Sequence, residues 1–209
     1  MRKSLATFLL SATALAALFF QVAGPASASP SARSVPTDTI INATYPVTGS
    51  TFISKLNATI TLGPGTLASS LDLQTSALTG TLTLPPATGS FKILGFIPVT
   101  ATTEFAQDGT ATGTLKNGVV TTTTQVTLKL TSLKAAGIPI FVGSQCQTSP
   151  ATITVTSQPG FSLLNGGNLA GTYTIPPFSH CGLATLLINL TIPGANNTIT
   201  LTLGKAKIG

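Results

Sequence analysis

Threonine and aliphatic residues alternate along much of this chain, and the alternation limits the folds open to it. Threonine occupies 38 of the 209 positions. Successive side chains of an extended strand point to opposite faces, so a period of two predicts strands with one buried face. Residues 119–130 show the pattern best, with Val120, Val126, Leu128 and Leu130 in one phase and Thr121, Thr123, Gln125, Thr127 and Lys129 in the other. We expect the first set to be buried and the second to face water.

Glycine-containing turns separate the alternating segments. Asp108-Gly109 and Asn117-Gly118 are strong signals for two-residue hairpin loops. They predict a meander in which residues 110–116 form a short strand that lies at an edge or over solvent and contributes little to the core. Residues 52–62 also alternate and predict one continuous strand.

The repeated strand and turn signals predict an all-β chain: an antiparallel β-sandwich or barrel-like single domain with little helix. One short segment has helical spacing, with leucines at positions 183, 186, 187 and 190. A buried strand is an alternative for so short a run.

The N-terminus resembles a secretion signal. Arg2 and Lys3 precede an apolar run, and Ala26-Ser27-Ala28 forms a small-residue cleavage site. A membrane anchor is the alternative, but the charged start and the cleavage site favour a signal peptide. We therefore divide the chain into a signal peptide (1–28), a flexible lead-in (29–39) and an all-β domain (40–209), with no membrane span in the mature chain. The expected location is secreted or extracellular, in the cell envelope, after cleavage near Ala28.

The chain has two cysteines, Cys146 and Cys181. In an exported protein they predict a disulfide, which would close a loop of about 35 residues. Two buried free thiols are the alternative.

Few side chains could carry chemistry. The only histidine, His180, lies next to a cysteine expected to be in a disulfide, and the carboxylates are Asp38, Asp72, Glu104 and Asp108. Asp108 is explained by its turn, and Asp72 and Glu104 have polar neighbours in phase. We predict no enzyme activity, no catalytic or metal site and no cofactor. The basic residues are scattered, which argues against a nucleic-acid partner.

Two segments place large apolar groups on both faces of an extended chain. They supply the candidate apolar ligand surface: Phe91, Ile93, Leu94, Phe96, Ile97, Ile140 and Phe141. A central strand buried on both sides, or a sandwich corner, would produce the same pattern.

Two segments, FKILGFIPVTATTEF (residues 91–105) and TYTIPPFSHCG (residues 172–182), resemble uncharacterised small secreted Thr/Gly-rich β proteins of actinobacteria. The resemblance extends from about Asn42 onward. It implies nothing about activity and carries over no catalytic residues.

These observations predict an exported, non-catalytic, β-rich protein of the cell envelope or extracellular space. Its expected partner is an apolar or amphiphilic small molecule, bound at an apolar surface or in an internal space. The alternative is a structural or adhesive module that acts through contacts with an envelope protein.

Overall fold

A computed structural model gives the fold and describes residues 39–93 and 95–209. The expected signal peptide and all of the lead-in but Thr39 lie outside these residues. The elements are β1 (Ile40–Ile53), η1 (Ser54–Leu56), β2 (Ala58–Asp72), β3 (Ala77–Thr83), β4 (Ala87–Ile93), β5 (Ile97–Lys116), β6 (Val119–Ala135), β7 (Ile138–Ile140), β8 (Gln147–Thr148), β9 (Ala151–Ser157), β10 (Gly167–Ile175), β11 (Phe178–Ser179), η2 (Gly182–Ala184), α1 (Thr185–Thr191), β12 (Gly194–Leu203) and β13 (Lys207–Ile208).

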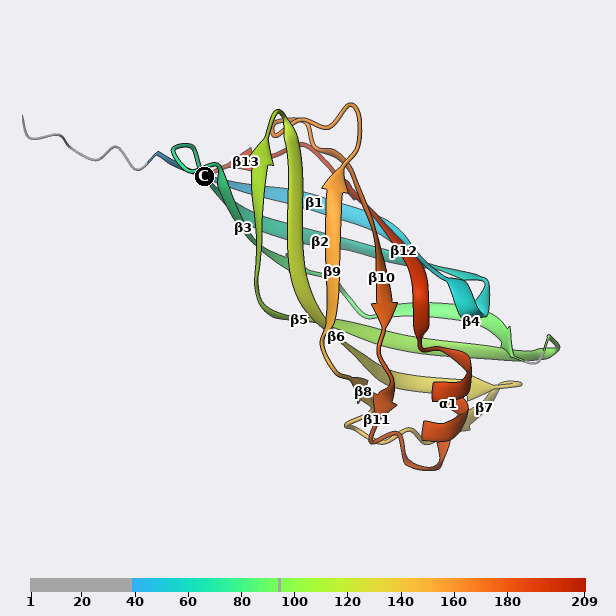
Figure 1. The fold of residues 1–209 in the computed structure, drawn as a ribbon. Helices are drawn as coiled ribbons and strands as arrows, with labels where there is room; N and C mark the ends of the chain where they lie inside the picture. The colour runs from blue at the N-terminus through green and yellow to red at the C-terminus, as the bar shows by residue number, and fades with distance from the viewer. Residues whose placement is uncertain (1–38, 94) are drawn as a thin grey trace, which may run out of the picture. The chain divides into compact units, whose positions relative to one another are not determined.

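Eight of the strands form a closed antiparallel barrel (Figure 1). The hydrogen-bonded order is β6-β9-β10-β12-β1-β2-β3-β5, and pairing of β5 with β6 closes the ring. Closure leaves none of these strands as a free sheet edge along its paired length. The barrel-like single domain predicted from alternation is therefore confirmed.

The alternation places the core inside the barrel. On β6, Val120, Val126, Leu128 and Leu130 are all buried, whereas the intervening residues are partly or fully exposed. Outward threonines of neighbouring strands bond to each other, as Thr123 does to Thr154 at 2.8 Å. The register predicted for this strand is correct, and the threonine face is the outer wall.

One of the two predicted hairpins forms. Asn117 and Gly118, with φ of 51° and 78°, close the turn between β5 and β6. Asp108-Gly109 does not close a hairpin: β5 runs through it, and the pairing register with β6 shifts between Asp108 and Thr112. Gly109 has a φ of 76°, so the glycine supplies a bulge instead of a turn.

Residues 110–116 are consequently not an edge strand. They form the second half of β5, with β3 on one side and β6 on the other. The single strand predicted for residues 52–62 is also wrong, because η1 interrupts it and Asn57 adopts a left-handed conformation with φ of 47°. Apolar and polar residues keep alternating through the β1–β2 hairpin, so the sequence pattern does not reveal the turn.

The first half of β5 and the second half of β6 extend beyond the barrel ring. There β4 replaces β3 beside β5, while β7 and β8 pair with β6. The short helix α1 packs at this end of the domain (Figure 1). Across the residues that the structure describes, no helix is long and apolar enough to cross a membrane.

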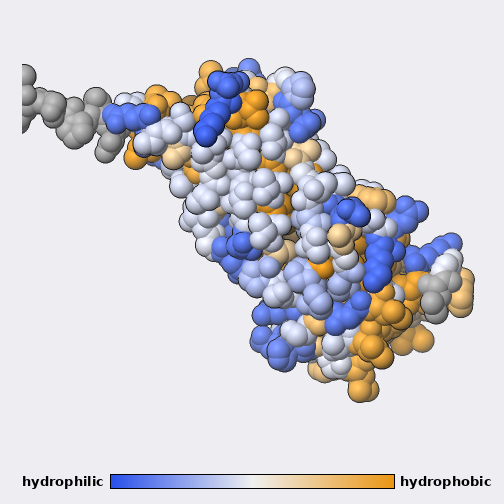
Figure 2. Space-filling view, in the orientation of Figure 1, coloured by the Kyte–Doolittle hydropathy of each residue, from blue (hydrophilic) through white to orange (hydrophobic). Residues whose placement is uncertain are grey.

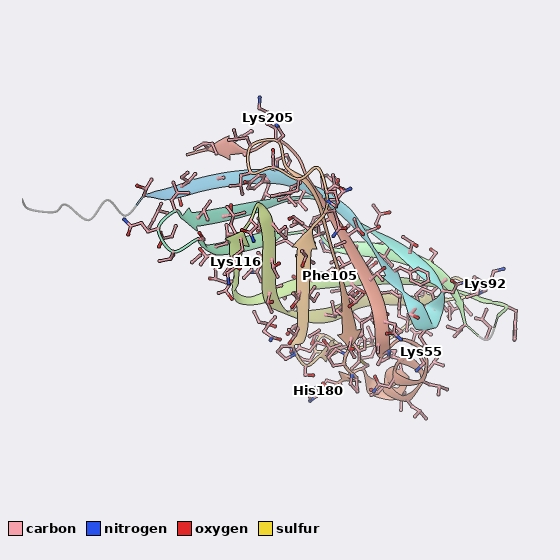
Figure 3. The ribbon with its side chains drawn as sticks, turned by 45° about the horizontal axis from the view of Figure 1, so that its top comes forward. Lys55, Lys92, Phe105, Lys116, His180 and Lys205 are labelled. Atoms are coloured by element: carbon pink, nitrogen blue, oxygen red, sulfur yellow. A yellow bond between two sulfur atoms is a disulfide. The ribbon has the colours of Figure 1, made fainter. Side chains whose placement is uncertain are left out.

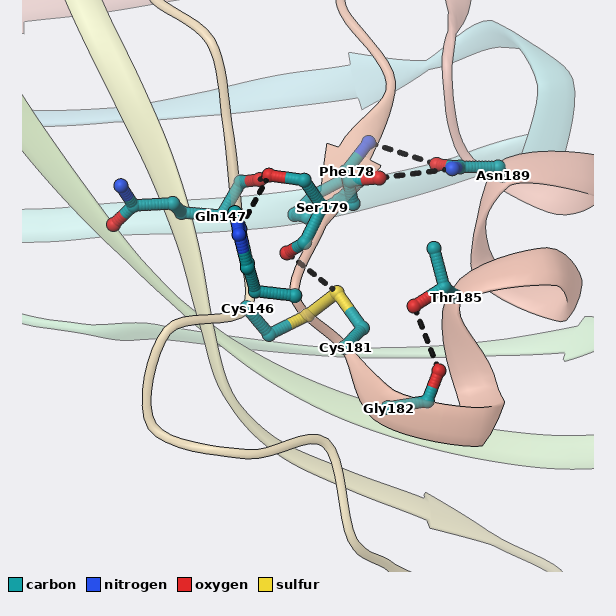
Figure 4. Close-up of a disulfide and its surroundings, with 9 residues drawn as sticks. Cys146, Gln147, Phe178, Ser179, Cys181, Gly182, Thr185 and Asn189 are labelled. Atoms are coloured by element: carbon teal, nitrogen blue, oxygen red, sulfur yellow. Dashed lines mark hydrogen bonds between the residues drawn. A yellow bond between two sulfur atoms is a disulfide. The ribbon is translucent and has the colours of Figure 1, made fainter.

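The predicted disulfide is present and lies beside the start of the helical segment (Figure 4). Cys146 and Cys181 are fully buried, with Cα atoms 4.4 Å apart. The Cys146 carbonyl accepts a hydrogen bond from the Leu130 N–H at 2.8 Å, and Cys181 precedes η2 and α1 directly. The bridge thus connects β6 to the helical segment.

Candidate functional site: an apolar cavity in the barrel

The barrel interior contains a cavity of about 80 Å³. Every barrel strand contributes to its wall, and fourteen of its seventeen lining residues are aliphatic or aromatic. One lining residue from each strand is Val47, Leu62, Leu82, Phe105, Val126, Ile153, Leu169 and Leu201. Phe105 lies near the middle of the domain in Figure 3. A closed barrel of eight strands is large enough either to be filled by side chains or to hold one small ligand.

A second cavity of about 70 Å³ adjoins the first. The two have five lining residues in common: Leu67, Ala111, Thr122, Leu169 and Leu203. Phe161 and Leu163, from the connection between β9 and β10, line the second cavity, and the Tyr45 hydroxyl donates to the Leu163 carbonyl at 2.7 Å. This connection therefore closes one end of the barrel. Burial raises the pKa of Tyr45.

The polar side chains of the first cavity are Gln107, Thr122 and Thr124. Backbone pairing of β3 with β5 ends at Gly80. Beyond this point the Gln107 side chain supplies the hydrogen bonds to the backbone of β3. Its oxygen accepts from the Leu82 N–H at 2.7 Å, and its nitrogen donates to the carbonyls of Gly80 (3.0 Å) and Gly109 (2.8 Å). The amide thus bridges two strands where their ladder stops, and its hydrogens are committed to the backbone.

We predict that Gln107→Leu lowers the free energy of unfolding by about 1–3 kcal/mol, because it leaves backbone groups of the wall unpaired. Gln125→Leu is the control: the Gln125 side chain is exposed and bonds to the Thr152 hydroxyl. It should change stability by about 0.5 kcal/mol or less. Urea unfolding of both variants makes the comparison, and equal losses would contradict the role given to Gln107.

Among the residues that the structure describes, every buried polar side chain has a hydrogen-bond partner. Thr51 bonds to the Tyr173 hydroxyl at 2.7 Å and donates to the Thr198 carbonyl at 2.9 Å. Asn197 donates to the carbonyls of Gly194 and Tyr173 and accepts from the Ser54 N–H. Burial raises the pKa of Tyr173, and the hydrogen bond with Thr51 opposes this in part. This cluster joins β1, β10 and β12, which is a structural role.

The other titratable groups considered from the sequence do not converge. His180 is exposed, with Nδ1 3.0 Å from the Ser179 hydroxyl. Asp72 is partly exposed and caps a turn: hydrogen bonds from the Thr75 hydroxyl and the N–H groups of Gln74 and Thr75 lower its pKa. Asp108 accepts from the Thr127 hydroxyl at 2.6 Å. Within the described part of the chain, no three His, Cys, Asp or Glu side chains are grouped so that they could hold a metal ion.

The candidate ligand surface predicted from the sequence lies outside the barrel cavity. Phe91, Ile93 and Ile140 come together beneath α1 around a space of about 20 Å³, against Ile188 of the helix. Ile97 pairs with Ile93 and is half-buried. In contrast, Phe96 and Phe141 are 72 % and 88 % exposed. Leu94 lies outside the described residues.

Local sequence patterns do not show which residues line the barrel cavity. Its wall residues come from all eight strands, and each looks like an ordinary inward position. Gln107 is the only cavity residue with a partial sequence signal: it is polar, yet it occupies the same alternating position of its strand as Phe105. No protein-family profile, curated protein or solved structure matches the chain.

Proposed function

We propose that this protein is an exported, non-catalytic binding protein that takes an apolar or amphiphilic small molecule into its barrel. The observation that carries the proposal is the apolar cavity of about 80 Å³ enclosed by all eight barrel strands. The buried disulfide supports an extracellular location, since such bonds persist in oxidising compartments.

The chemistry of the wall favours an apolar ligand over water or a polar metabolite. A buried water needs two to four polar partners. In the cavity wall the Gln107 amide hydrogens are used by the backbone, and the Thr124 hydroxyl lies 3.4 Å from the Gln125 carbonyl as a donor. The Thr122 hydroxyl is the other polar side-chain group of the lining. A ligand without polar groups would fill the space at no cost in lost hydrogen bonds.

The volume sets the size of the group bound. The two adjoining cavities measure about 80 and 70 Å³. An engineered apolar cavity of roughly 150 Å³ binds benzene. Small rotations of the shared side chains would join the two cavities, so we propose a ring-sized apolar group or the end of an alkyl chain as the buried part of the ligand.

Binding is a better proposal than catalysis because of what faces the cavity. Among the described residues, no carboxylate, imidazole or free thiol lines either cavity. A nucleophilic hydroxyl needs an adjacent base to activate it. The Ser69 and Tyr45 hydroxyls of the second cavity donate instead to the backbone carbonyls of Ala43 and Leu163.

The test is to fill the cavity from one side chain. Ala111 lines both cavities, and Ala111→Leu would place three more carbon atoms in them. We expect the wild-type chain to bind toluene, seen as shifts of methyl signals from leucines and valines in NMR. Ala111→Leu should bind it at least tenfold more weakly while gaining or keeping stability, because it fills a void.

Ala106→Leu is the matched control, since Ala106 is an exposed residue of the same strand. It should bind toluene like the wild type. Absence of binding by the wild type, or equal binding by Ala111→Leu, would contradict the proposal. Native mass spectrometry of protein purified from its own host would then identify the natural ligand.

A second candidate function is a structural or adhesive module acting through protein–protein contacts. The observation in its favour is the exposed apolar end of the domain near α1, where Leu183 and Leu186 are 103 % and 81 % exposed. A protein complex that depends on these leucines would support this function.

A further inference from the structure

The helical segment formed by η2 and α1 turns its leucines toward solvent. Leu183, Leu186 and Leu190 are 103 %, 81 % and 67 % exposed, whereas Ile188 on the opposite side is 2 % exposed. The spacing of three and four residues places the leucines on one face. Figure 2 shows hydrophobic side chains gathered at this end of the domain.

Three separate contacts fix the helix in this orientation. Ile188 packs against the apolar residues of β4, β6 and β7. The Asn189 side chain bonds both ways to the backbone of Phe178, accepting from its N–H at 2.7 Å and donating to its carbonyl at 2.9 Å (Figure 4). The disulfide holds Cys181 just before η2. These contacts therefore hold the leucines in their exposed positions.

Neighbouring segments extend the apolar surface. Phe96 at the tip of the β4–β5 hairpin, Ile138 at the start of β7 and Phe141 just after it are 72 %, 69 % and 88 % exposed. We call these three residues, together with Leu183, Leu186 and Leu190, the α1-end patch. Contiguous exposed apolar surface of this kind marks an interaction site in a soluble domain.

Three lysines lie on segments next to the patch. Lys55 donates to the Pro193 carbonyl, just after α1, at 3.3 Å. Lys92 lies on β4 beside Ile93, and Lys134 pairs with Pro139 of β7. All three are exposed, and Figure 3 shows Lys55 and Lys92 on the α1 side of the domain, away from Lys116 and Lys205.

The carboxylates lie on elements other than those that carry the patch. Of the three that the structure describes, Asp72 ends β2 at the opposite end of the domain, Asp108 is in the bulge of β5, and Glu104 is opposite Lys129. None belongs to β4, β7, η2 or α1. Over the described residues, the elements that carry the patch hold no carboxylate, and the segments next to them hold these three lysines.

We propose that the α1-end patch docks on an anionic lipid bilayer surface, with its leucines and phenylalanines in the acyl boundary and the three lysines among the headgroup phosphates. Interfacial helices combine an apolar face of Leu and Phe with flanking Lys. Protein interfaces favour Tyr, Trp, Phe, Met and Arg and are depleted of Lys, and the patch has Phe but no Tyr, Trp, Met or Arg. The inference goes beyond ligand binding in the barrel and does not depend on it.

The test is flotation of the full chain with vesicles of phosphatidylcholine and phosphatidylglycerol in equal parts, against phosphatidylcholine alone. We expect binding to the mixed vesicles, and loss of most of it at about 1 M salt, where the Debye length is about 3 Å. Leu183→Ser/Leu186→Ser/Leu190→Ser should weaken binding on the order of a hundredfold, because three leucines no longer enter the apolar layer. Lys55→Gln/Lys92→Gln/Lys134→Gln should weaken vesicle binding by a similar factor, at about fivefold per lysine.

Matched controls come from the opposite end of the domain. Leu73, Leu164 and Ile208 are 49 %, 63 % and 55 % exposed, and Lys116, Lys205 and Lys207 supply three more exposed lysines. Serine and glutamine substitutions there should leave binding unchanged. Far-ultraviolet circular dichroism before flotation confirms that each variant is folded.

Three results would overturn the proposal. One is failure of the wild-type chain to float with the mixed vesicles at low salt. Another is loss of binding in the control variants but not in the patch variants. The third is a dimer, or a complex with a protein, that depends on the three leucines in a chain that does not bind vesicles.

Discussion

Removal of the disulfide should lower the free energy of unfolding by roughly 4 kcal/mol, from the chain entropy of a 35-residue loop. The variant is Cys146→Ala/Cys181→Ala, which leaves no unpaired buried thiol. The enclosed chain contains β8 to β11, so the bridge restrains two barrel strands, β9 and β10, in the unfolded state. Urea unfolding measures the loss.

Reduction provides the control for this prediction. Dithiothreitol should move the urea midpoint of the wild-type chain toward that of the double variant and leave the variant unchanged. If the double variant unfolded at the wild-type midpoint, the bridge would contribute nothing to stability. Because Cys181 precedes η2 directly, the variant should also weaken vesicle binding if the disulfide helps to fix α1.

The fold class could be predicted because it depends on local information. A strand with one solvated face and one buried face needs only a period of two. Residues 125–130 provide it, with Gln125, Thr127 and Lys129 alternating with Val126, Leu128 and Leu130. Asn117-Gly118 is equally local, since two consecutive residues with positive φ form the turn by themselves. Closure of the ring is not local, because it requires β5 and β6 to meet after β1, β2 and β3 on one side and β9, β10 and β12 on the other.

Asp108-Gly109 shows where local signals fail. A hairpin there would fold residues 97–107 onto residues 110–116 and leave half of the long apolar face of β6 without a partner. The chain instead pairs β5 with β6 from Val99 to Lys116 and uses the glycine in a bulge. Hydrogen bonding and packing along the whole of β6 outweigh the preference of two residues for a turn.

The helix α1 shows a different limit of prediction from sequence. The spacing of Leu183, Leu186, Leu187 and Leu190 is correctly helical, and α1 covers residues 185–191. Spacing defines a face but not the direction in which it points. The direction is set by Ile188, by the Asn189 bonds to Phe178 and by the disulfide, all of which depend on the tertiary structure. For the same reason the barrel cavity could not be predicted, since its volume is what remains after all eight strands have packed.

Truncation of one inward leucine of β6 should have the other large effect on stability. Leu128 is 3 % exposed and pairs with Phe105 across the β5–β6 ladder. We expect Leu128→Ala to lower the free energy of unfolding by about 2–5 kcal/mol, because it removes buried methyl groups and leaves a void that a closed barrel cannot collapse. Urea unfolding with a fixed m-value gives the difference.

Two variants serve as controls for this truncation. Thr123→Ala, on the outer face of the same strand, should cost about 0.5 kcal/mol or less. Leu186→Ala removes the same atoms as Leu128→Ala from a residue that is 81 % exposed, and should also have little effect. If Thr123→Ala were the more destabilising of the two β6 variants, the strand would be out of register by one residue. Every inward and outward assignment on β6, including the cavity wall formed by Thr122 and Val126, would then be reversed.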